Sequence, residues 1–287
     1  MMIDNEAALR AQSLCVRYDD VAVLDGIDVA IPRGAVIALV GRNGAGKSTL
    51  LRCMVGLSVP ERGAVQVLGC PAMALDDATR GRIGYVDQTP DLLGWLGVWE
   101  HVRYIGGFYA RWDEGRARDL LIRFGLSDDR QVGKLSVGEQ QKLSIVLALA
   151  HDPELVLMDE PVASLDPLAR RDFLRALFER DEGEDARTVV LSSHLLTDLE
   201  RVASHVLFLR HGKVQWFGEH DALSEQVRVL TLGSALPLDP GLPGLLAHRR
   251  VGDGWRAVVD TRLFTPCPSH DAGRAMNLDD LFVELNA

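Results

Sequence analysis

The segment that most constrains this chain is GRNGAGKST at positions 41–49, which follows the continuous apolar run AVIALV at 35–40. An apolar run that stops at a glycine predicts a buried parallel strand, and the residues from Lys47 to Val55 predict a helix. Their junction matches GxxxxGK[ST], in which glycines let backbone amides turn onto phosphates, the lysine adds a cation and a serine hydroxyl can bind Mg²⁺. A glycine-rich turn without a ligand is the alternative. The predicted phosphate-contacting residues are Gly41, Asn43, Gly44, Ala45, Gly46, Lys47, Ser48 and Thr49.

Composition limits the possible partners of the chain. Its 287 residues include 31 Lys and Arg against 41 Asp and Glu, for a net charge of −10. A sequence-independent nucleic-acid binder would need a basic face, so we expect no nucleic-acid partner. The four cysteines lack a CxxC spacing, which predicts neither a zinc site nor a disulfide framework and favours the cytosol. No signal peptide is apparent, and no run approaches the ~18 apolar residues of a membrane helix, so work at a membrane would require a partner.

Hydrophobic patterning predicts an α/β fold. The stretches SLCVRY (13–18) and IDVAI (27–31) are typical of a small antiparallel sheet. Two further apolar runs, ELVLM (154–158) and TVVLSS (188–193), are each followed by a helix-like segment, which is the alternation of a parallel sheet. Strand signals fade between about 91 and 150, where WEHVRYIGGFYARW and RARDLLIRFGL predict a helical subdomain.

The pattern changes after about residue 220, where prolines separate short strand-like pieces such as VRVLTL and WRAVV. The final NLDDLFVEL predicts a helix capped by Asn277. The residues expected on its apolar face are Leu278, Leu281, Phe282 and Leu285. We therefore expect one domain over 1–220 and a small α+β extension over 221–287, which either helps two subunits to pair or covers a sheet edge.

A pair of adjacent acids follows another apolar run, in LVLMDEP at 155–161. Asp159 and Glu160 would then lie at the carboxyl end of a buried strand, which is the ligand edge of an open parallel sheet. The aspartate can hold Mg²⁺, and the glutamate can orient or deprotonate an attacking water. A solvated acidic turn is the alternative, because acids favour turns and surfaces.

The stretch LSVGEQQK at 135–142 allows two interpretations. As a helix start, Ser136 would cap and Glu139 would close a capping box. The apolar stripe of that helix would consist of Leu143, Val146, Leu147 and Ala150. The same exposed amides can also bind an anion, because a helix N-terminus carries partial positive charge.

These motifs, in this order, resemble those of the ATP-binding cassette (ABC) ATPases, and the resemblance covers about residues 10–220. LSVGEQQK is similar to the signature loop of the family, and LVLMDEP to its metal-and-base strand. Taken alone, Tyr18 would be a half-buried strand aromatic, Gln88 a surface amide, Asp166 a turn residue and His194 a capping histidine. In the family, the residue at the position of Tyr18 stacks on adenine, and the one at Gln88 links Mg²⁺ and water to the membrane partner. The residue at Asp166 crosses the dimer interface, and the one at His194 acts as a switch.

The resemblance implies a P-loop NTPase cassette in which two copies pair head to tail around ATP and Mg²⁺. One subunit would supply the phosphate loop and Tyr18, and the other would supply Ser136, Gly138 and Asp166. The implied catalytic residues are Lys47, Gln88, Glu160 and His194. The implied Mg²⁺ ligands are Ser48, Gln88 and Asp159. Catalysis in such a site consists of positioning and of electrostatic stabilisation of the transferring phosphoryl group.

The family also implies an integral membrane permease as partner, which would hold the chain at the cytoplasmic face of the membrane. A groove near Gln88 and the segment 91–107 would receive a helix of that permease. Trp95 and Trp99 suit such a groove, although both also suit a core. The phrase LGVWEHVRY, the altered signature and the C-terminal helix resemble the exporter branch, which acts on drugs, antibiotics, peptides or lipid-like substrates. An importer ATPase and a soluble, non-transport ABC ATPase are the alternatives, and the lack of sustained heptads disfavours the second.

Two positions depart from the usual family signature, Leu-Ser-Gly-Gly-Gln. Val137 stands at the third and Glu139 at the fifth, whereas Ser136 and Gly138, which contact the γ-phosphate in the family, are present. Glu139 adds a negative charge where phosphates must dock. We expect Glu139→Gln to strengthen ATP-driven closure, measured as ATP affinity and turnover. No change in either quantity would contradict this expectation.

Overall fold

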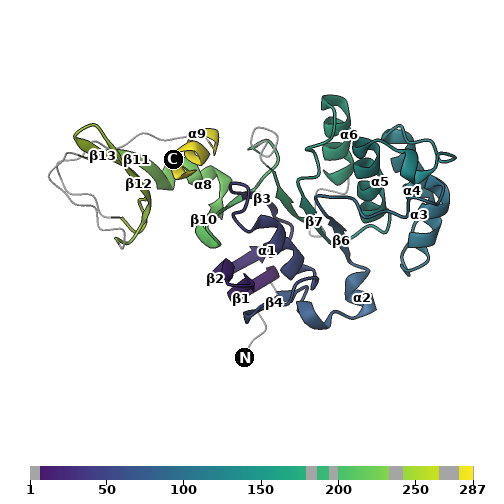
Figure 1. Ribbon diagram of the computed structural model, residues 1–287, viewed down its shortest axis with the longest axis horizontal. Helices are drawn as coiled ribbons and strands as arrows, with labels where there is room; N and C mark the ends of the chain where they lie inside the picture. Colours follow the sequence, from purple (N-terminus) through teal and green to yellow (C-terminus); the bar gives the residue numbers. More distant parts are fainter. Residues whose placement is uncertain (1–6, 179–185, 194–199, 233–241, 265–277, 287) are drawn as a thin grey trace.

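The structure is a computed structural model that describes residues 7–178, 186–193, 200–232, 242–264 and 278–286 (Figure 1). At its centre is a six-stranded sheet in the order β10-β9-β3-β8-β7-β6, in which all neighbours are parallel except β10 and β9. The predicted α/β fold class is therefore confirmed. The strands are β3 (Val36–Val40), β6 (Ile83–Val86), β7 (Leu155–Asp159), β8 (Thr188–Ser192), β9 (His205–Arg210) and β10 (Lys213–Glu219).

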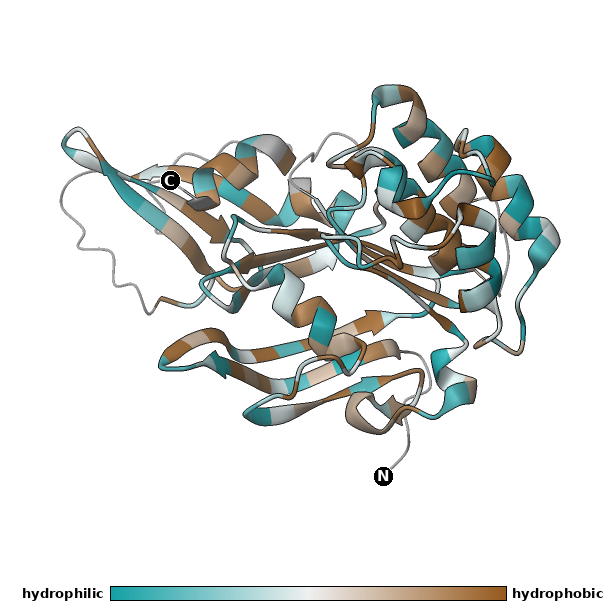
Figure 2. Ribbon diagram, turned by 45° about the vertical axis from the view of Figure 1, so that its right-hand side comes forward, coloured by the Kyte–Doolittle hydropathy of each residue, from teal (hydrophilic) through white to brown (hydrophobic). Residues whose placement is uncertain are grey.

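Both faces of this sheet are buried, which explains why its inner strands are continuously apolar. Ala38 and Val40 of β3 face one core, and Ile37 and Leu39 face another. Helix α1 (Lys47–Met54) contributes to the second core and lies between the central sheet and a smaller sheet below it (Figure 2). Helix α6 (Pro167–Phe178) packs on the opposite face, where its Phe173 is fully buried.

The smaller sheet is antiparallel in the order β2-β1-β4-β5, as expected. Its strands β1 (Ala7–Tyr18) and β2 (Val21–Pro32) are longer than the two predicted stretches, because register shifts let β1 continue past polar residues. The shorter strands β4 (Arg62–Val67) and β5 (Cys70–Pro71) complete the sheet and were not predicted. One turn of helix, α2 (Asp77–Arg80), then leads to β6.

The helical subdomain contains α3 (Val98–Gly106), α4 (Glu114–Arg123) and α5 (Val137–Leu149). Helix α3 ends at Gly106, whereas the prediction extended the helix over residues 99–112. The chain turns back after this point. Trp112 then packs over Gly106, where an added Cβ would lie 2.5 Å from the indole nitrogen. Helix α5 buries more than the predicted stripe, since it is enclosed by neighbouring helices and the sheet. The additional buried residues are Gln141, Ile145, Ala148 and Leu149, whereas Leu147 of the predicted stripe is only partly buried.

The C-terminal part begins with α8 (His220–Gln226) and continues into an antiparallel sheet in the order β11-β13-β12. These strands are β11 (Val227–Leu232), β12 (Leu245–Val251) and β13 (Gly254–Asp260). Helix α9 (Leu278–Asn286) buries Leu278, Leu281 and Leu285 and partly buries Phe282, so its predicted apolar face is confirmed. The predicted cap Asn277 lies outside the described residues. This extension shares a core with the rest of the chain, since Val229 belongs to the same cluster as Phe173.

None of the helices in the described ranges combines the length and apolar composition needed to cross a bilayer.

A buried arginine ties the central sheet to α6. Arg187, which is 5% exposed, donates to the carbonyls of Pro153 and Leu177 and to the Asp152 carboxylate, each at 2.9 Å. The guanidinium therefore satisfies the end of α6 and the turn before β7 together.

We expect Arg187→Met to lower the free energy of unfolding by about 3 kcal/mol, because it leaves two buried carbonyls and a carboxylate without this donor. Urea denaturation measures the change. The matched control is Arg80→Gln, which removes an exposed pair with Asp77 at 3.4 Å and should cost less than about 0.5 kcal/mol. Equal urea midpoints for wild type and Arg187→Met would contradict the prediction.

Candidate nucleotide-binding site

The predicted phosphate loop connects β3 to α1, and its glycines are required sterically. Gly46 has φ +103°, and a Cβ there would lie 2.7 Å from Leu24. A Cβ on Gly41 would lie 2.3 Å from the carbonyl oxygen of Leu209 in β9. The loop therefore packs tightly against neighbouring strands, which leaves no room for side chains at these two glycines.

Lys47 is the first residue of α1 and its side chain folds back over the loop. Its Nζ donates to the carbonyls of Gly41 at 2.8 Å and Arg42 at 3.4 Å, and it lies 4.0 Å from Oε1 of Glu160. The lysine is 7% exposed. The Lys47 ammonium group is thus held against the phosphate loop, where a bound phosphate group can contact it.

A cavity of about 460 Å³ opens above the loop. It collects residues that are distant in sequence and that were predicted to act together, and it also includes Val23, which sequence reasoning missed. The lining consists of Tyr18, Val23, Asn43, Gly44, Gly46, Lys47, Ser48, Thr49, Gln88, Asp159 and Glu160. Gly41 supplies a carbonyl to Lys47 instead, and Ala45 lines a neighbouring cavity of about 210 Å³ together with Arg42.

Tyr18 marks the entrance of the cavity. Its side chain is 50% exposed, and its hydroxyl lies 3.4 Å from that of Ser58. The structure therefore places an accessible aromatic ring beside the phosphate loop rather than in the core of the small sheet. Such a ring can stack on a planar base.

Asp159 and Glu160 are organised by Ser192, a residue that sequence reasoning did not assign to the site. β7 and β8 are parallel with Asp159 opposite Ser192. The Ser192 hydroxyl donates to Oδ1 of Asp159 and accepts the backbone N–H of Glu160 at 2.9 Å. Asp159 and Ser192 are 33 residues apart, so only the pairing of their strands reveals this contact.

The other carboxylate oxygen of Asp159 is suited to a metal ion. Its Oδ2 is buried and has no hydrogen-bond partner in the described part of the chain. A buried carboxylate oxygen without a donor is costly unless a cation compensates it. Ser48 and Gln88 line the same cavity and offer further oxygen ligands, which is the donor type that Mg²⁺ prefers. The residues present therefore fit the predicted Mg²⁺.

Glu160 adopts a backbone conformation that is uncommon for a residue with a side chain. Its φ is +49°, and its N–H is directed at Ser192. Such strain costs roughly 1 kcal/mol or more and persists where the surroundings enforce it. The result is a glutamate that is 7% exposed and aimed into the cavity toward Lys47.

Gln88 follows β6 and lines the cavity. Its neighbour Asp87 accepts the Gln88 N–H at 2.8 Å and two bonds from Arg52 of α1, at 2.8 and 3.2 Å. The hydrogen bond and charge of Asp87 raise the pKa of the Arg52 guanidinium. Asp87 thereby links the phosphate-loop helix to Gln88, a role that sequence reasoning missed.

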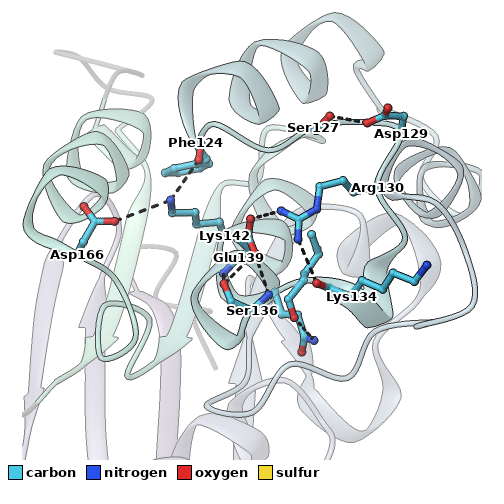
Figure 3. Close-up of polar contacts among 11 residues, drawn as sticks. Phe124, Ser127, Asp129, Arg130, Lys134, Ser136, Glu139, Lys142 and Asp166 are labelled. Carbon is cyan, nitrogen blue, oxygen red and sulfur yellow. Dashed lines mark hydrogen bonds and ion pairs between the residues drawn. The ribbon is translucent and has the colours of Figure 1, made fainter.

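The capping box predicted at the start of α5 is present. Ser136 N donates to Oε2 of Glu139 at 2.8 Å, and Glu139 N donates to the Ser136 hydroxyl at 3.3 Å. The backbone N–H of Ser136, its hydroxyl and Arg130 lower the pKa of the Glu139 carboxyl, so it is ionised at neutral pH. Figure 3 shows this carboxylate between Ser136 and Arg130.

Gly138 allows close contact between α5 and the loop that carries Asp166, since a Cβ at Gly138 would lie 2.7 Å from the carbonyl oxygen of Ser164. Asp166 caps α6 by accepting the N–H groups of Leu168 and Ala169, each at 3.0 Å. Its pKa is lowered chiefly by the Ala169 N–H. Ser136, Gly138 and Asp166 therefore gather on one surface, outside the lining of the cavity above the phosphate loop. His194 lies outside the described residues.

A second cavity of about 420 Å³ lies beside Gln88, between the central sheet and the helical subdomain. It is lined by apolar residues such as Leu57, Leu92 and Tyr109 and by the acids Asp87 and Asp91. The two tryptophans expected near such a groove lie outside its lining. Trp95 is 71% exposed, and Trp99 packs on the core with the Arg118 guanidinium 3.7 Å from its ring centre.

Comparisons with known proteins agree with this architecture. A family model described as ABC transporter matches residues 24–163. The nickel import ATP-binding protein NikO of Rhodobacter capsulatus is 36% identical over 246 residues, covering 80% of this chain and 96% of the relative. The Nod factor export ATP-binding protein I of a Rhizobium species is 32% identical over 218 residues, covering 73% and 70%.

A solved dimeric structure of an ATP-binding cassette, in a post-hydrolysis state with ADP and phosphate bound, is also similar. It has a TM-score of 0.66 at 25% sequence identity, and the match covers 74% of this chain and 98% of that one. The extent of the match to NikO, together with the fold, shows the family. The chain belongs to the ABC transporter ATP-binding proteins.

Proposed function

We propose that the chain is the ATP-hydrolysing subunit of a membrane transporter and that two copies close head to tail around two ATP molecules. One observation carries the proposal. The cavity above the phosphate loop collects Lys47, Asp159 and Glu160, whereas Ser136 and Gly138 lie on a separate, accessible surface. A second copy supplies that surface, and the dimeric relative with bound ADP and phosphate supports the arrangement.

The proposed reaction converts ATP and water into ADP and phosphate. Tyr18 stacks on adenine, and Lys47 with the loop amides binds the phosphates. Glu160 accepts a proton from the attacking water, and Ser136 and Gly138 of the other copy stabilise charge on the transferring group. Mg²⁺ held by Ser48, Gln88 and Asp159 would neutralise phosphate charge. Asp166 crosses the dimer interface, and Gln88 and His194 are the remaining proposed catalytic residues.

We further propose that the permease docks in the groove beside Gln88, at the cytoplasmic face of the membrane. The groove is lined by apolar residues such as Leu57 and Leu92 and by the acid Asp91, while Asp87 is already paired with Arg52. This lining suits an amphipathic helix with a basic end. Asp87 also accepts hydrogen bonds from Arg52 and from the Gln88 N–H. A helix in the groove would therefore contact a residue that is bonded both to the phosphate-loop helix α1 and to Gln88.

Export of a drug, antibiotic, peptide or lipid-like substrate is the proposed direction, on the strength of the sequence resemblance to exporters. Import is the second candidate, favoured by the similarity to a nickel import protein. The alternative of a soluble, non-transport ATPase predicts that no membrane protein binds. Transport of candidate compounds by inverted and right-side-out vesicles that contain the chain and its permease distinguishes the directions.

We expect Glu160→Gln to lower turnover at least about 100-fold while ATP binding persists, because the proposed general base is lost but the phosphate loop is unchanged. Phosphate release measures turnover, and light scattering with and without ATP measures dimerisation. The control is Glu114→Gln, whose side chain is 60% exposed in the helical subdomain and which should leave both unchanged. Phosphate release at the wild-type rate by Glu160→Gln would overturn the assignment of the base.

The docking proposal is tested with a charge placed in the groove. We expect Leu57→Asp to reduce co-purification with the co-expressed permease at least about tenfold, because a carboxylate must then be buried or left unpaired. Leu263→Asp is the matched control, since Leu57 and Leu263 are 65% and 64% exposed. ATP hydrolysis by the isolated chain should not change. Full co-purification of Leu57→Asp would exclude this groove as the docking site.

A further inference from the structure

Arg130 contacts the signature loop from the turn that precedes it. Its Nη1 donates to Oε1 of Glu139, and its Nη2 donates to the carbonyl oxygen of Lys134 at 3.0 Å (Figure 3). Arg130 is 42% exposed and Glu139 26% exposed. The guanidinium is thus fixed both to the backbone of the turn and to the glutamate that replaces the usual glutamine of the family.

Glu139 in turn binds the Ser136 hydroxyl, which the proposed reaction needs as a donor to phosphate. Oε2 of Glu139 accepts the Ser136 hydroxyl hydrogen at 2.8 Å and the Ser136 N–H at 2.8 Å. A phosphate of the facing subunit must therefore displace a carboxylate from that hydroxyl, and it must also approach the negative charge of Glu139. A glutamine at this position would impose no such repulsion.

We propose that Arg130 is a positioning residue for ATP-driven dimer closure, because it neutralises Glu139 and holds its carboxylate back while the Ser136 hydroxyl turns to the phosphate. This inference rests on the proposed nucleotide sandwich. Arg130 acts through Glu139, since its guanidinium is already bound to the Glu139 carboxylate and to the Lys134 carbonyl. The pair keeps the start of α5 electrically neutral, so the partial positive charge of the helix remains available to an anion.

The alternative is that Arg130 only braces the turn through Lys134. A double-mutant cycle separates the two explanations. Arg130→Gln leaves one uncompensated negative charge beside Ser136, Glu139→Gln leaves one positive charge, and the double variant leaves none. Both glutamines retain hydrogen-bonding groups of similar size.

Closure is measured as the ATP-dependent dimerisation constant, with each variant placed in the Glu160→Gln background, and turnover is measured with Glu160 intact. We expect Arg130→Gln to weaken closure about threefold per site and therefore roughly tenfold per dimer, because each dimer contains two such sites. Adding Glu139→Gln should restore closure to within about twofold of the starting protein. The loss should also shrink as ionic strength rises.

Three controls keep the outcomes distinct. Affinity of the monomer for ATP should be unchanged in every variant. Arg103→Gln, which removes an exposed arginine 3.9 Å from Glu114 in the same subdomain, should have no effect on closure. Thermal unfolding verifies that the variants remain folded.

Rescue of Arg130→Gln by Glu139→Gln supports the proposal. A double variant as defective as Arg130→Gln, or an Arg130→Gln variant that closes normally, overturns it. If the Glu160→Gln protein itself does not dimerise with ATP, the proposed function fails rather than the role of Arg130.

Discussion

The parallel pairing of β3 with β8 and β9, and of β8 with β7, is the constraint on which the site depends. Parallel strands bring their carboxyl ends to one edge of the sheet. The phosphate loop after β3, the acids at the carboxyl end of β7 and Ser192 at the end of β8 therefore meet there, although Gly41 and Ser192 are more than a hundred residues apart in the sequence. Burial of both sheet faces holds these ends in register.

The strained backbone of Glu160 and the buried carboxylate of Asp159 lie at the same edge of the sheet. Glu160 has a positive φ, and its N–H is bound by a serine that also holds Asp159. One oxygen of Asp159 remains buried without a donor in the described chain, and it is the group that a cation would satisfy. The arrangement costs stability in the free protein and preorganises the site for its charged ligand.

The surface formed by Ser136, Gly138 and Asp166 depends on a different set of contacts. Gly138 allows α5 to approach Ser164, and Lys142 of α5 donates to the carbonyl of Phe124 at 3.2 Å while lying 4.0 Å from Oδ2 of Asp166 (Figure 3). The proposed pair of Arg130 and Glu139 completes this surface. In the proposed dimer, this pair allows a carboxylate to occupy a position that faces phosphate.

The groove and the nucleotide cavity are joined by consecutive residues. Asp87 lines the groove and Gln88 lines the cavity. Arg52 connects Asp87 to the helix that begins with Lys47. A short, hydrogen-bonded path therefore runs between the proposed permease contact and the phosphate loop.

Local patterns in the sequence determined the phosphate loop, the capping box and the acidic strand end, because each depends on neighbours within a few residues. Tertiary structure decided the strand order, the contacts of Ser192, the hydrogen bonds between Arg52 and Asp87, and the lining of the groove beside Gln88. Each of these joins residues far apart in the chain, and short-range periodicity carries no information about such pairs. Glu139 also depends on the fold, although its partner Arg130 is only nine residues away. Its charge is visible in the sequence, but only the fold brings Arg130 to its carboxylate, because the guanidinium must pass over the turn and reach the start of α5.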